Sequence, residues 1–169
     1  MILDKEYFTN NDTVFLAKDL LGKSIVKIIN NQTLKVLITE SEAYHGEADL
    51  ASHARFGKTN RNQIMYRQGG VWYIYLCYGL HWMLNIVTGE EGFPAAVLIR
   101  GINNIHGPGK VTKFLNINKG FNGLDAVYES NLYIEDSNIT PKYIEATPRV
   151  GIDYAGEWVK KPWRFILHQ

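Results

Sequence analysis

Fifteen residues from Thr39 to His53, TESEAYHGEADLASH, concentrate groups that can do chemistry. The run holds four carboxylates, two histidines and one tyrosine. Glu40, Glu42 and Tyr44 alternate with other residues, so in a strand they share one face. A carboxylate on a mostly apolar face has a raised pKa, which suits a general base. Glu40 and Glu42 are therefore both candidates for that role, whereas Glu47 and Asp49 are expected to be solvated carboxylates of a loop.

Aromatic and basic residues elsewhere could complete such a site. Tyr44, His53 and Tyr75 offer flat faces on which a planar ligand such as a nucleobase can stack. Arg100 ends the apolar run AAVLIRG and offers a fixed cation to an anion or to a polarised water. Taken singly, each residue also has an ordinary explanation, because strand-end charges are usually solvated and sheet tyrosines usually pack in the core.

Several familiar sites are absent from the sequence. GPGKVT lacks the first glycine of a phosphate-binding loop, and no G-x-S-x-G motif occurs. The histidines do not have zinc-ligand spacing, and Cys77 is the only cysteine. We therefore expect no metal, no cofactor and no internal disulfide.

The charge distribution points to an anionic partner. The net charge is only +1, yet residues 50–124 hold eight Lys and Arg against two acidic residues. The flanking segments are acidic, with eight acids and five bases in residues 1–49 and seven and five in residues 125–169. Nucleic acid is the leading candidate for a partner of the basic middle, although chance clustering explains the same numbers equally well.

The elements that must position these residues read as antiparallel strands with few, short helices. NDTVFLAKDLLG predicts a helix capped by Asp12 or Thr13 and ended by Gly22. KSIVKII and QTLKVLITESEAY predict a hairpin that turns at Asn30-Asn31. Along the second strand, strict alternation puts the following residues on one face: Leu34, Val36, Ile38, Glu40, Glu42 and Tyr44.

The long run GGVWYIYLCYGLHWMLNIV predicts two more strands with a turn at Gly79. Val71, Tyr73, Tyr75 and Cys77 then share one face. AAVLIRG, NLYIED and EATPRVGI predict later strands, and HGPGKVTKFLNI predicts a loop leading into a helix. The expected fold class is α+β: a single compact domain over residues 1–169, with a curved antiparallel β-sheet and a few short helices.

Taken together, these motifs resemble the alkyladenine (3-methyladenine) DNA glycosylase family. The resemblance begins with ITESEAYHGEADLASHARFGKTNRN and continues through GGVWYIYLCYGLHWMLNIV, AAVLIRG, GPGKVTKFLNI, TPRVGI and KPWRF, covering nearly the whole chain in order. Its most specific parts are Glu-Ala-Tyr with a histidine nine residues later, Tyr-x-Tyr-x-x-Tyr-Gly with a later asparagine, and Val-Leu-x-Arg. The family fold is a single mixed α/β domain with a curved antiparallel sheet, without a metal.

The resemblance implies a role for each matched residue. Glu42 matches the general base that activates water, and Arg100 matches the arginine that positions this water. The aromatic walls that hold the extruded base match Tyr44, His53 and Tyr75.

Residues that contact the rest of the DNA are implied in the same way. Tyr78 matches the side chain that enters the minor groove and fills the gap left by the flipped nucleotide. Asn85 matches the pocket asparagine that clashes with the 2-amino group of normal guanine. The basic middle segment supplies the expected phosphate contacts: Arg55, Lys58, Arg61 and Arg67.

The expected function is therefore base-excision repair. A monofunctional, DNA-3-methyladenine-type glycosylase would flip alkylated or deaminated purines out of double-stranded DNA and hydrolyse the N-glycosidic bond, leaving an abasic site without cutting the strand. We expect an intracellular monomer that acts on DNA, since the sequence has no secretory signal and no apolar run long enough for a membrane.

Two alternatives stay open at this point. A catalytically inactive nucleic-acid-binding domain would keep the basic segment and the aromatics without needing Glu42 and Arg100 together. An O-glycoside hydrolase could pair Glu40 with Glu42, although it would leave the basic segment unexplained. The segment between Arg100 and Gly107 is shorter than in many family members, and the preferred lesion, hypoxanthine or a methylated purine, cannot be read from the sequence.

Overall fold

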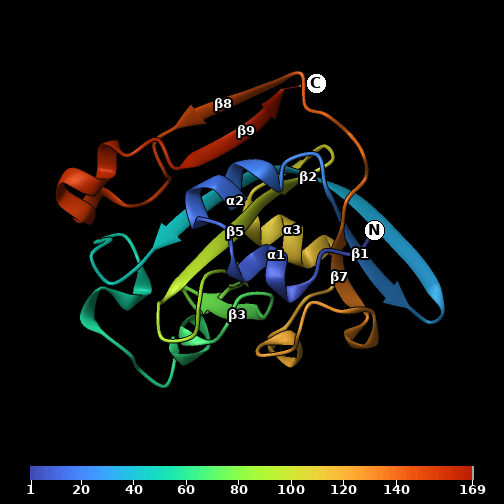
Figure 1. The fold of residues 1–169 in the computed structure, drawn as a ribbon, viewed down its shortest axis with the longest axis horizontal. Coiled ribbons are helices and arrows are strands. Elements are labelled where there is room, and N and C mark those ends of the chain that lie inside the picture. The colour runs from blue at the N-terminus through green and yellow to red at the C-terminus, as the bar shows by residue number, and fades with distance from the viewer. Residues whose placement is uncertain (169) are drawn as a thin grey trace.

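An open antiparallel sheet of nine strands organises residues 1–168, the part of the chain that the computed structural model describes (Figure 1). The strands are β1 (Ser24–Ile29), β2 (Gln32–His45), β3 (Trp72–Cys77), β4 (His81–Val87), β5 (Ala95–Ile102), β6 (Ile105–His106), β7 (Leu132–Glu135), β8 (Tyr143–Thr147) and β9 (Arg164–His168). Their order is β3-β4-β5-β2-β1-β7, with β6 added to β5, and with β9 joining β8 to β2. The predicted fold class, α+β with an antiparallel sheet, is confirmed.

The helices are short, as predicted. They are α1 (Lys5–Thr9), α2 (Thr13–Asp19) and α3 (Pro108–Phe114), with 3-10 segments at η1 (His53–Phe56), η2 (Gln63–Tyr66), η3 (Lys119–Phe121), η4 (Tyr128–Ser130) and η5 (Asp153–Lys160), the last kinked at Gly156. Asp12 caps α2, because its Oδ1 accepts the main-chain N–H groups of Val14 and Phe15 at 2.9 and 3.0 Å. α1 and η5 were not anticipated from the sequence. None of the helices in residues 1–168 combines the length and apolar composition that crossing a membrane requires.

The main hydrophobic core lies on one face of the sheet. Leu16 of α2 and Val111 of α3 pack there against Ile74, Ile86 and Ile99 of the sheet, and all five are fully or almost fully buried. The hairpin between β1 and β2 turns at Asn30 and Asn31, as predicted, and both residues have positive φ. Such a pair of positive φ values matches the tight turns that suit the twist of adjacent strands.

The alternation predicted along β2 is wrong beyond Ile38, because a β-bulge interrupts it. Pairing with β5 shifts between Ile38 and Glu40, and again between Glu40 and Ser41. Ile38 and Ala43 are five residues apart, yet both belong to the main core. One extra residue in the strand exchanges the faces of everything after it. The bulge therefore turns the candidate base Glu42 away from the core that holds Ile38.

A second irregularity lies opposite, in β5. Ile99 pairs with Ser41 and Gly101 pairs with Glu40, which leaves Arg100 without a pairing partner in β2. Bulges commonly re-aim a side chain next to a functional site. Here both irregularities act on the same place, where Arg100 meets the carboxylates of β2.

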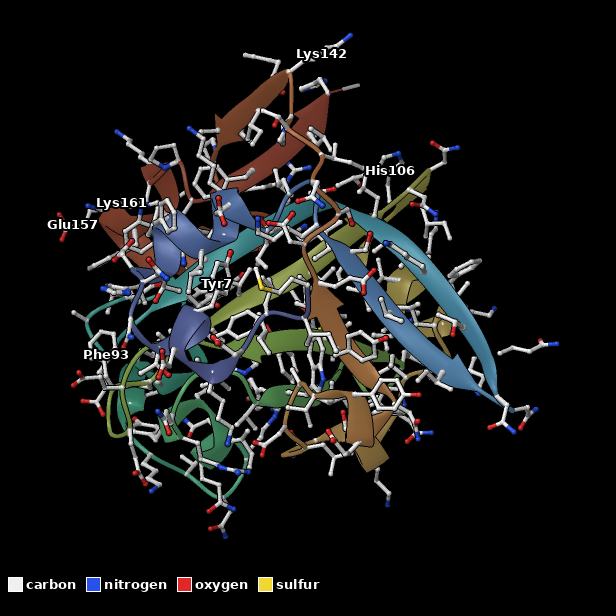
Figure 2. The ribbon with its side chains drawn as sticks, turned by 45° about the vertical axis from the view of Figure 1, so that its right-hand side comes forward. Tyr7, Phe93, His106, Lys142, Glu157 and Lys161 are labelled. Atoms are coloured by element: carbon white, nitrogen blue, oxygen red, sulfur yellow. The ribbon has the colours of Figure 1, made fainter. Side chains whose placement is uncertain are left out.

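The other face of the sheet is covered by loops. Val71, Tyr73 and Tyr75 lie there, as the predicted alternation of β3 requires, together with Met65 of η2. Figures 1 and 2 show that the segment following β2, which carries η1, and the segment carrying η5 lie on the same side of the molecule. Residues about a hundred positions apart in the sequence can thus meet over this face.

Candidate active site

A cavity of about 450 Å³ opens on the loop-covered face. Its volume lies within the range usual for small-ligand sites. The sheet supplies one part of its lining, namely Tyr44, Tyr73, Tyr75, Cys77, Met83, Asn85, Ala96, Leu98 and Arg100. Loops and short helices supply the rest, namely Ala51, His53, Arg61, Met65, Tyr78, Pro108, Val150, Gly151, Ile152 and Tyr154. Of the residues assigned to base binding or catalysis, only Glu42 does not line it.

Glu42 lies directly behind the wall of this cavity and has no exposed surface. Its Oε1 accepts the main-chain N–H of Val150 at 2.7 Å, and its Oε2 accepts the hydroxyl of Tyr44 at 2.8 Å. The Nε of Arg100 lies 3.5 Å from the same Oε1. All three partners line the cavity, so the carboxylate is held one side chain away from any bound ligand.

The surroundings of Glu42 act on its pKa in opposite directions. Burial raises the pKa, because a charged carboxylate loses its hydration. The Arg100 guanidinium, the Val150 N–H, the Tyr44 hydroxyl and the Arg149 guanidinium all lower it again. Burial is the larger effect, so the pKa of Glu42 lies above that of an ordinary glutamate.

Glu40 has a different environment from Glu42. Its Oε1 accepts from the Nε of Arg164 at 2.7 Å and from the Nε of Arg100 at 3.1 Å. These bonds tie β2 to β9 and β5, and neither carboxylate oxygen of Glu42 takes part in them. Two arginines thus bind one oxygen of Glu40, an environment that favours the ionised carboxylate over the protonated form that a general acid needs.

His53 and Tyr75 together form one wall of the cavity. Their ring centres are 4.3 Å apart at an interplanar angle of 63°, which leaves no space for a base between them. The Nδ1 of His53 lies 3.2 Å from the hydroxyl of Tyr73. Burial, with smaller effects of Arg61 and Arg55, lowers the pKa of His53 to about 4. The imidazole is therefore neutral at neutral pH.

Tyr44 provides a separate wall, supported from behind. The Cζ of Arg149 lies 4.9 Å from the Tyr44 ring centre and 5.1 Å from that of Trp163, so the guanidinium sits between two rings. Its Nη1 also donates to the carbonyl of Ala43 at 2.9 Å. Because Val150 follows Arg149 directly, this one arginine fixes both the aromatic wall and the N–H that holds Glu42.

Asp49 corrects another expectation. A position in the HGEADL loop suggested a solvated carboxylate, but Asp49 is completely buried. Its two oxygens accept hydrogen bonds from both terminal nitrogens of Arg149, at 2.6 and 2.9 Å. Two-pronged pairing of this kind is the strong form of an arginine–carboxylate contact. Glu47, from the same loop, is exposed, and it accepts the hydroxyl of Tyr66 at 2.7 Å.

Asn85 lies on the cavity floor and is almost fully buried. Its Nδ2 donates to the carbonyls of Tyr73 and Met83 at 3.1 and 3.4 Å. These bonds occupy the amide nitrogen and leave Oδ1 as the group that can face a ligand. A hydrogen-bond acceptor is thus available at this point of the cavity.

Tyr78 stands at the tip of the hairpin between β3 and β4. It is 93% exposed and has φ of +51°, and Gly79 follows with φ of +66°. Every other non-glycine residue with positive φ in residues 1–168 is an asparagine. A bulky side chain held in this conformation is unusual and points to a functional constraint.

The four basic residues assigned to phosphate lie in different places. Arg61 lines the cavity, and Arg55 stacks on Tyr154, which also lines it. Lys58 lies over the ring of Tyr66. Arg67 donates to the carbonyl of Gly123, near the Trp72 end of β3 and so away from Tyr78. Within residues 1–168, none of the four has a carboxylate within salt-bridge distance.

Sequence reasoning missed three parts of this arrangement. Tyr73 had a detectable signal, because it alternates with Tyr75 on the same face. Tyr154 and the N–H of Val150 had none, since both approach the site from segments more than a hundred residues after Glu42. No group of three or more His, Cys, Asp or Glu side chains in residues 1–168 is arranged to hold a metal ion.

A family model and individual relatives both assign the chain to the same protein family. The chain matches the model of one family, described as methylpurine-DNA glycosylase, over residues 7–107 and 103–169. It is 43% identical to a provisionally named 3-methyladenine DNA glycosylase of Anaeromyxobacter sp. (strain Fw109-5), over 99% of this chain and 89% of that protein. It is 40% identical to a protein of the same name from Chlamydia felis (strain Fe/C-56), over 99% of this chain and 96% of the relative. The two parts of the family match meet within residues 103–107, where β5 turns sharply into β6.

Proposed function

Because this chain belongs to the methylpurine-DNA glycosylase family, we propose that it removes alkylated purines from double-stranded DNA by hydrolysing the N-glycosidic bond. In this proposal Glu42 is the general base, Arg100 helps to position the water, and the product is an abasic site. The observation that carries it is the environment of Glu42: a buried carboxylate at the back of an aromatic cavity, held by Val150, Tyr44 and Arg100.

The target base has to leave the duplex before it can enter the cavity. Flipping a nucleotide costs a few kcal/mol, least for a damaged pair, and a side chain inserted into the gap offsets part of this loss. Tyr78 is the proposed wedge, because it projects from a tight hairpin at the cavity edge. Arg55, Lys58, Arg61 and Arg67 are the proposed phosphate contacts.

The extruded base would stack between Tyr44 on one side and the wall of His53 and Tyr75 on the other. Electron-rich rings attract a cationic base, and N-alkylated purines carry a positive charge. Asn85, on the cavity floor, would exclude a normal guanine because its side chain would clash with the 2-amino group.

Hydrolysis needs a water between Glu42 and the sugar. Oε1 of Glu42 faces both the Val150 N–H and the Arg100 guanidinium, whereas Oε2 has one hydrogen bond, from Tyr44, and a further lone pair with which to accept a water proton. Since Glu42 has no exposed surface, the wall formed by Tyr44 and Arg100 has to admit this water when the nucleotide binds. The Arg100 guanidinium would hold the water. The negative charge of the Glu42 carboxylate would stabilise an oxocarbenium-like sugar.

The residues around the cavity also favour simple hydrolysis of a cationic substrate. His53 is neutral because its pKa is lowered to about 4, so it cannot protonate a neutral leaving base efficiently. No lysine lines the cavity within residues 1–168, so an amine nucleophile that would lead to strand cleavage is not at hand. We therefore propose a monofunctional enzyme that prefers cationic alkylpurines to hypoxanthine.

The test is base release from duplex DNA methylated at purines, followed by hot alkali to reveal abasic sites. The wild-type protein should produce alkali-labile sites and leave the strand intact before alkali. Glu42→Gln should abolish release of the methylated purine and still bind the lesion duplex, because the substitution keeps the size of the side chain but removes the general base. Glu40→Gln is the matched control and should keep measurable release. Absence of alkali-labile sites with the wild-type protein would favour the inactive DNA-binding alternative.

A further inference from the structure

Three side chains, Tyr154, Arg55 and Phe56, form a stack that starts at the lining of the cavity. The Cζ of Arg55 lies 4.7 Å from the ring centre of Phe56 and 4.8 Å from that of Tyr154. Tyr154 lines the cavity, whereas Phe56 is 86% exposed. The stack therefore begins at the cavity lining and ends in solvent, and neither aromatic ring has a role in the mechanism above.

The stack is held in place by bonds beneath it. The Nη1 of Arg55 donates to the carbonyl of Ser52, and the hydroxyl of Tyr154 donates to the carbonyl of Ala51, both at 3.1 Å. Asn62, which is almost fully buried, uses its Nδ2 to bind the carbonyls at both ends of η1, each at 3.0 Å. A surface fixed in this way loses little conformational entropy when a ligand binds.

Protein stability does not account for the position of Phe56. Burying a phenylalanine side chain is worth roughly 1.5–3 kcal/mol, and a ring this exposed forgoes most of that. Its contact with Arg55 is the kind of surface cation–π pair that contributes only about 0.5–1 kcal/mol. Isolated exposed apolar residues are common, but this one extends a cation–aromatic stack that starts at the proposed base pocket.

The chemistry of the stack fits a nucleobase with its phosphate. Proteins bind single-stranded nucleic acid by combining aromatic faces, arginine and a positively charged surface. Arg55 supplies positive charge at the rings, and Arg61 lines the same cavity as Tyr154. Neither arginine has a carboxylate within salt-bridge distance in residues 1–168. Successive nucleotides follow each other at about 3.4 Å along a stacked strand. The two spacings in this stack, 4.7 and 4.8 Å, are somewhat longer, so the stack extends over the distance between a nucleotide in the cavity and its neighbour.

We propose that Phe56, Arg55 and Tyr154 form a second binding site, which holds an unpaired nucleotide next to the extruded one and lets the protein bind lesions in single-stranded DNA. The inference rests on the proposed function. A single strand has no gap for Tyr78 to fill, so its affinity has to come from stacking. In a duplex the neighbouring bases stay stacked in the helix, and Tyr78 contributes instead.

The test measures dissociation constants for a single strand and for the matching duplex, each carrying one tetrahydrofuran abasic analogue. Phe56→Ala should weaken binding of the single strand by about fivefold to 150-fold, the range expected for one lost base stack. Its effect on the duplex should stay within about twofold, as for an ordinary surface substitution. Tyr78→Ala should show the opposite pattern, and Phe56→Trp should keep single-strand affinity. Phe15→Ala, at an exposed phenylalanine of α2, is the matched control and should affect neither.

The outcomes separate this inference from the proposed function. If Phe56→Ala binds the single strand like Phe15→Ala, or weakens both DNA forms equally, the second site is refuted even when the wild-type protein releases methylated purines. If single-strand binding depends on Phe56 and yet no purine is released from methylated duplex DNA, the second site stands and the glycosylase proposal fails.

Discussion

At the scale of single residues, the pKa of Glu42 sets the pH range in which it can act. A general base works only when it is deprotonated. The rate at which the purine is released should therefore fall as pH drops through the pKa of Glu42. Since burial raises the pKa, the fall should begin above the range of an ordinary glutamate. Single-turnover rates across pH would measure it.

His53 makes that pH profile simpler to interpret. Its pKa is lowered to about 4, so it stays neutral from pH 5 to 8 and adds no step there. A rate that stays constant down to the ordinary glutamate range would contradict the assignment of Glu42. A bell-shaped profile near neutral pH would instead point to a second titrating group.

The acidic run shows what a sequence can and cannot reveal about single residues. Glu42 could be selected because its spacing to Tyr44 and the family motif both point to it. Asp49 could not be assigned correctly, because its partner Arg149 lies a hundred positions later. Burial of a carboxylate by a distant arginine leaves no trace in the local pattern of residues.

At the scale of elements, the hairpin of β3 and β4 is less stable than it would be with asparagine in place of Tyr78, which has a positive φ. An ordinary L-residue in the left-handed region costs about 1–2 kcal/mol, whereas asparagine tolerates it well. Tyr78→Asn should therefore raise the free energy of unfolding by about 1 kcal/mol. It should also weaken binding to lesion-bearing duplex DNA, since the wedge is lost.

Urea denaturation and anisotropy titrations would measure the two effects on the same variant. Tyr128→Asn is the matched control, because Tyr128 is an exposed tyrosine that does not line the cavity. It should leave duplex binding unchanged. Equal loss of binding in both variants would remove the wedge assignment.

The pair of Asp49 and Arg149 joins the loop after β2 to the loop before η5. Both side chains are fully buried, so removing one leaves the other charged and unpaired. Arg149→Met should lower the free energy of unfolding by about 3–5 kcal/mol. Lys35→Met, at an ion pair in which the lysine is 49% exposed, should cost less than about 1 kcal/mol.

The double variant Arg149→Met with Asp49→Leu tests the origin of that loss. Replacing both partners of a buried pair by apolar groups is often nearly neutral, so much of the stability should return. Base release should remain impaired, because Tyr44 and Val150 lose their support. Full recovery of both stability and release would make the pair purely structural.

Strands could be located from the sequence better than their faces. The hairpin at Asn30-Asn31 and the alternation of β3 depend on local patterns and were predicted correctly. The cap of α2, Asp12, was one of the two predicted, but the helix ends at Asp19 and not at Gly22. The faces of β2 were not, because polar and apolar residues continue to alternate through the bulge as they would in a regular strand. Only the shifted pairing with β5 reveals the change at Glu40.

At the scale of the whole molecule, charge should govern how strongly DNA binds. Each lysine or arginine that neutralises a phosphate releases counterions, so affinity should fall with salt. Arg55→Ala and Arg61→Ala should each reduce the slope of log affinity against log salt by about 1. Lys142→Ala should leave it unchanged, because Figure 2 places Lys142 at the end of the molecule formed by the turn before β8. A slope that responds equally to all three would mean a diffuse charge effect.

The N–H of Val150 that holds Glu42 has a consequence for the order of folding. Synthesis proceeds from the N-terminus, so this partner is made more than a hundred residues after Glu42 itself. Until it docks, the carboxylate keeps contact with water and with it the pKa of an ordinary acid. The site would then become active in one late step, together with closure of the cavity. A partly folded chain would bind DNA through residues 50–124 without producing abasic sites.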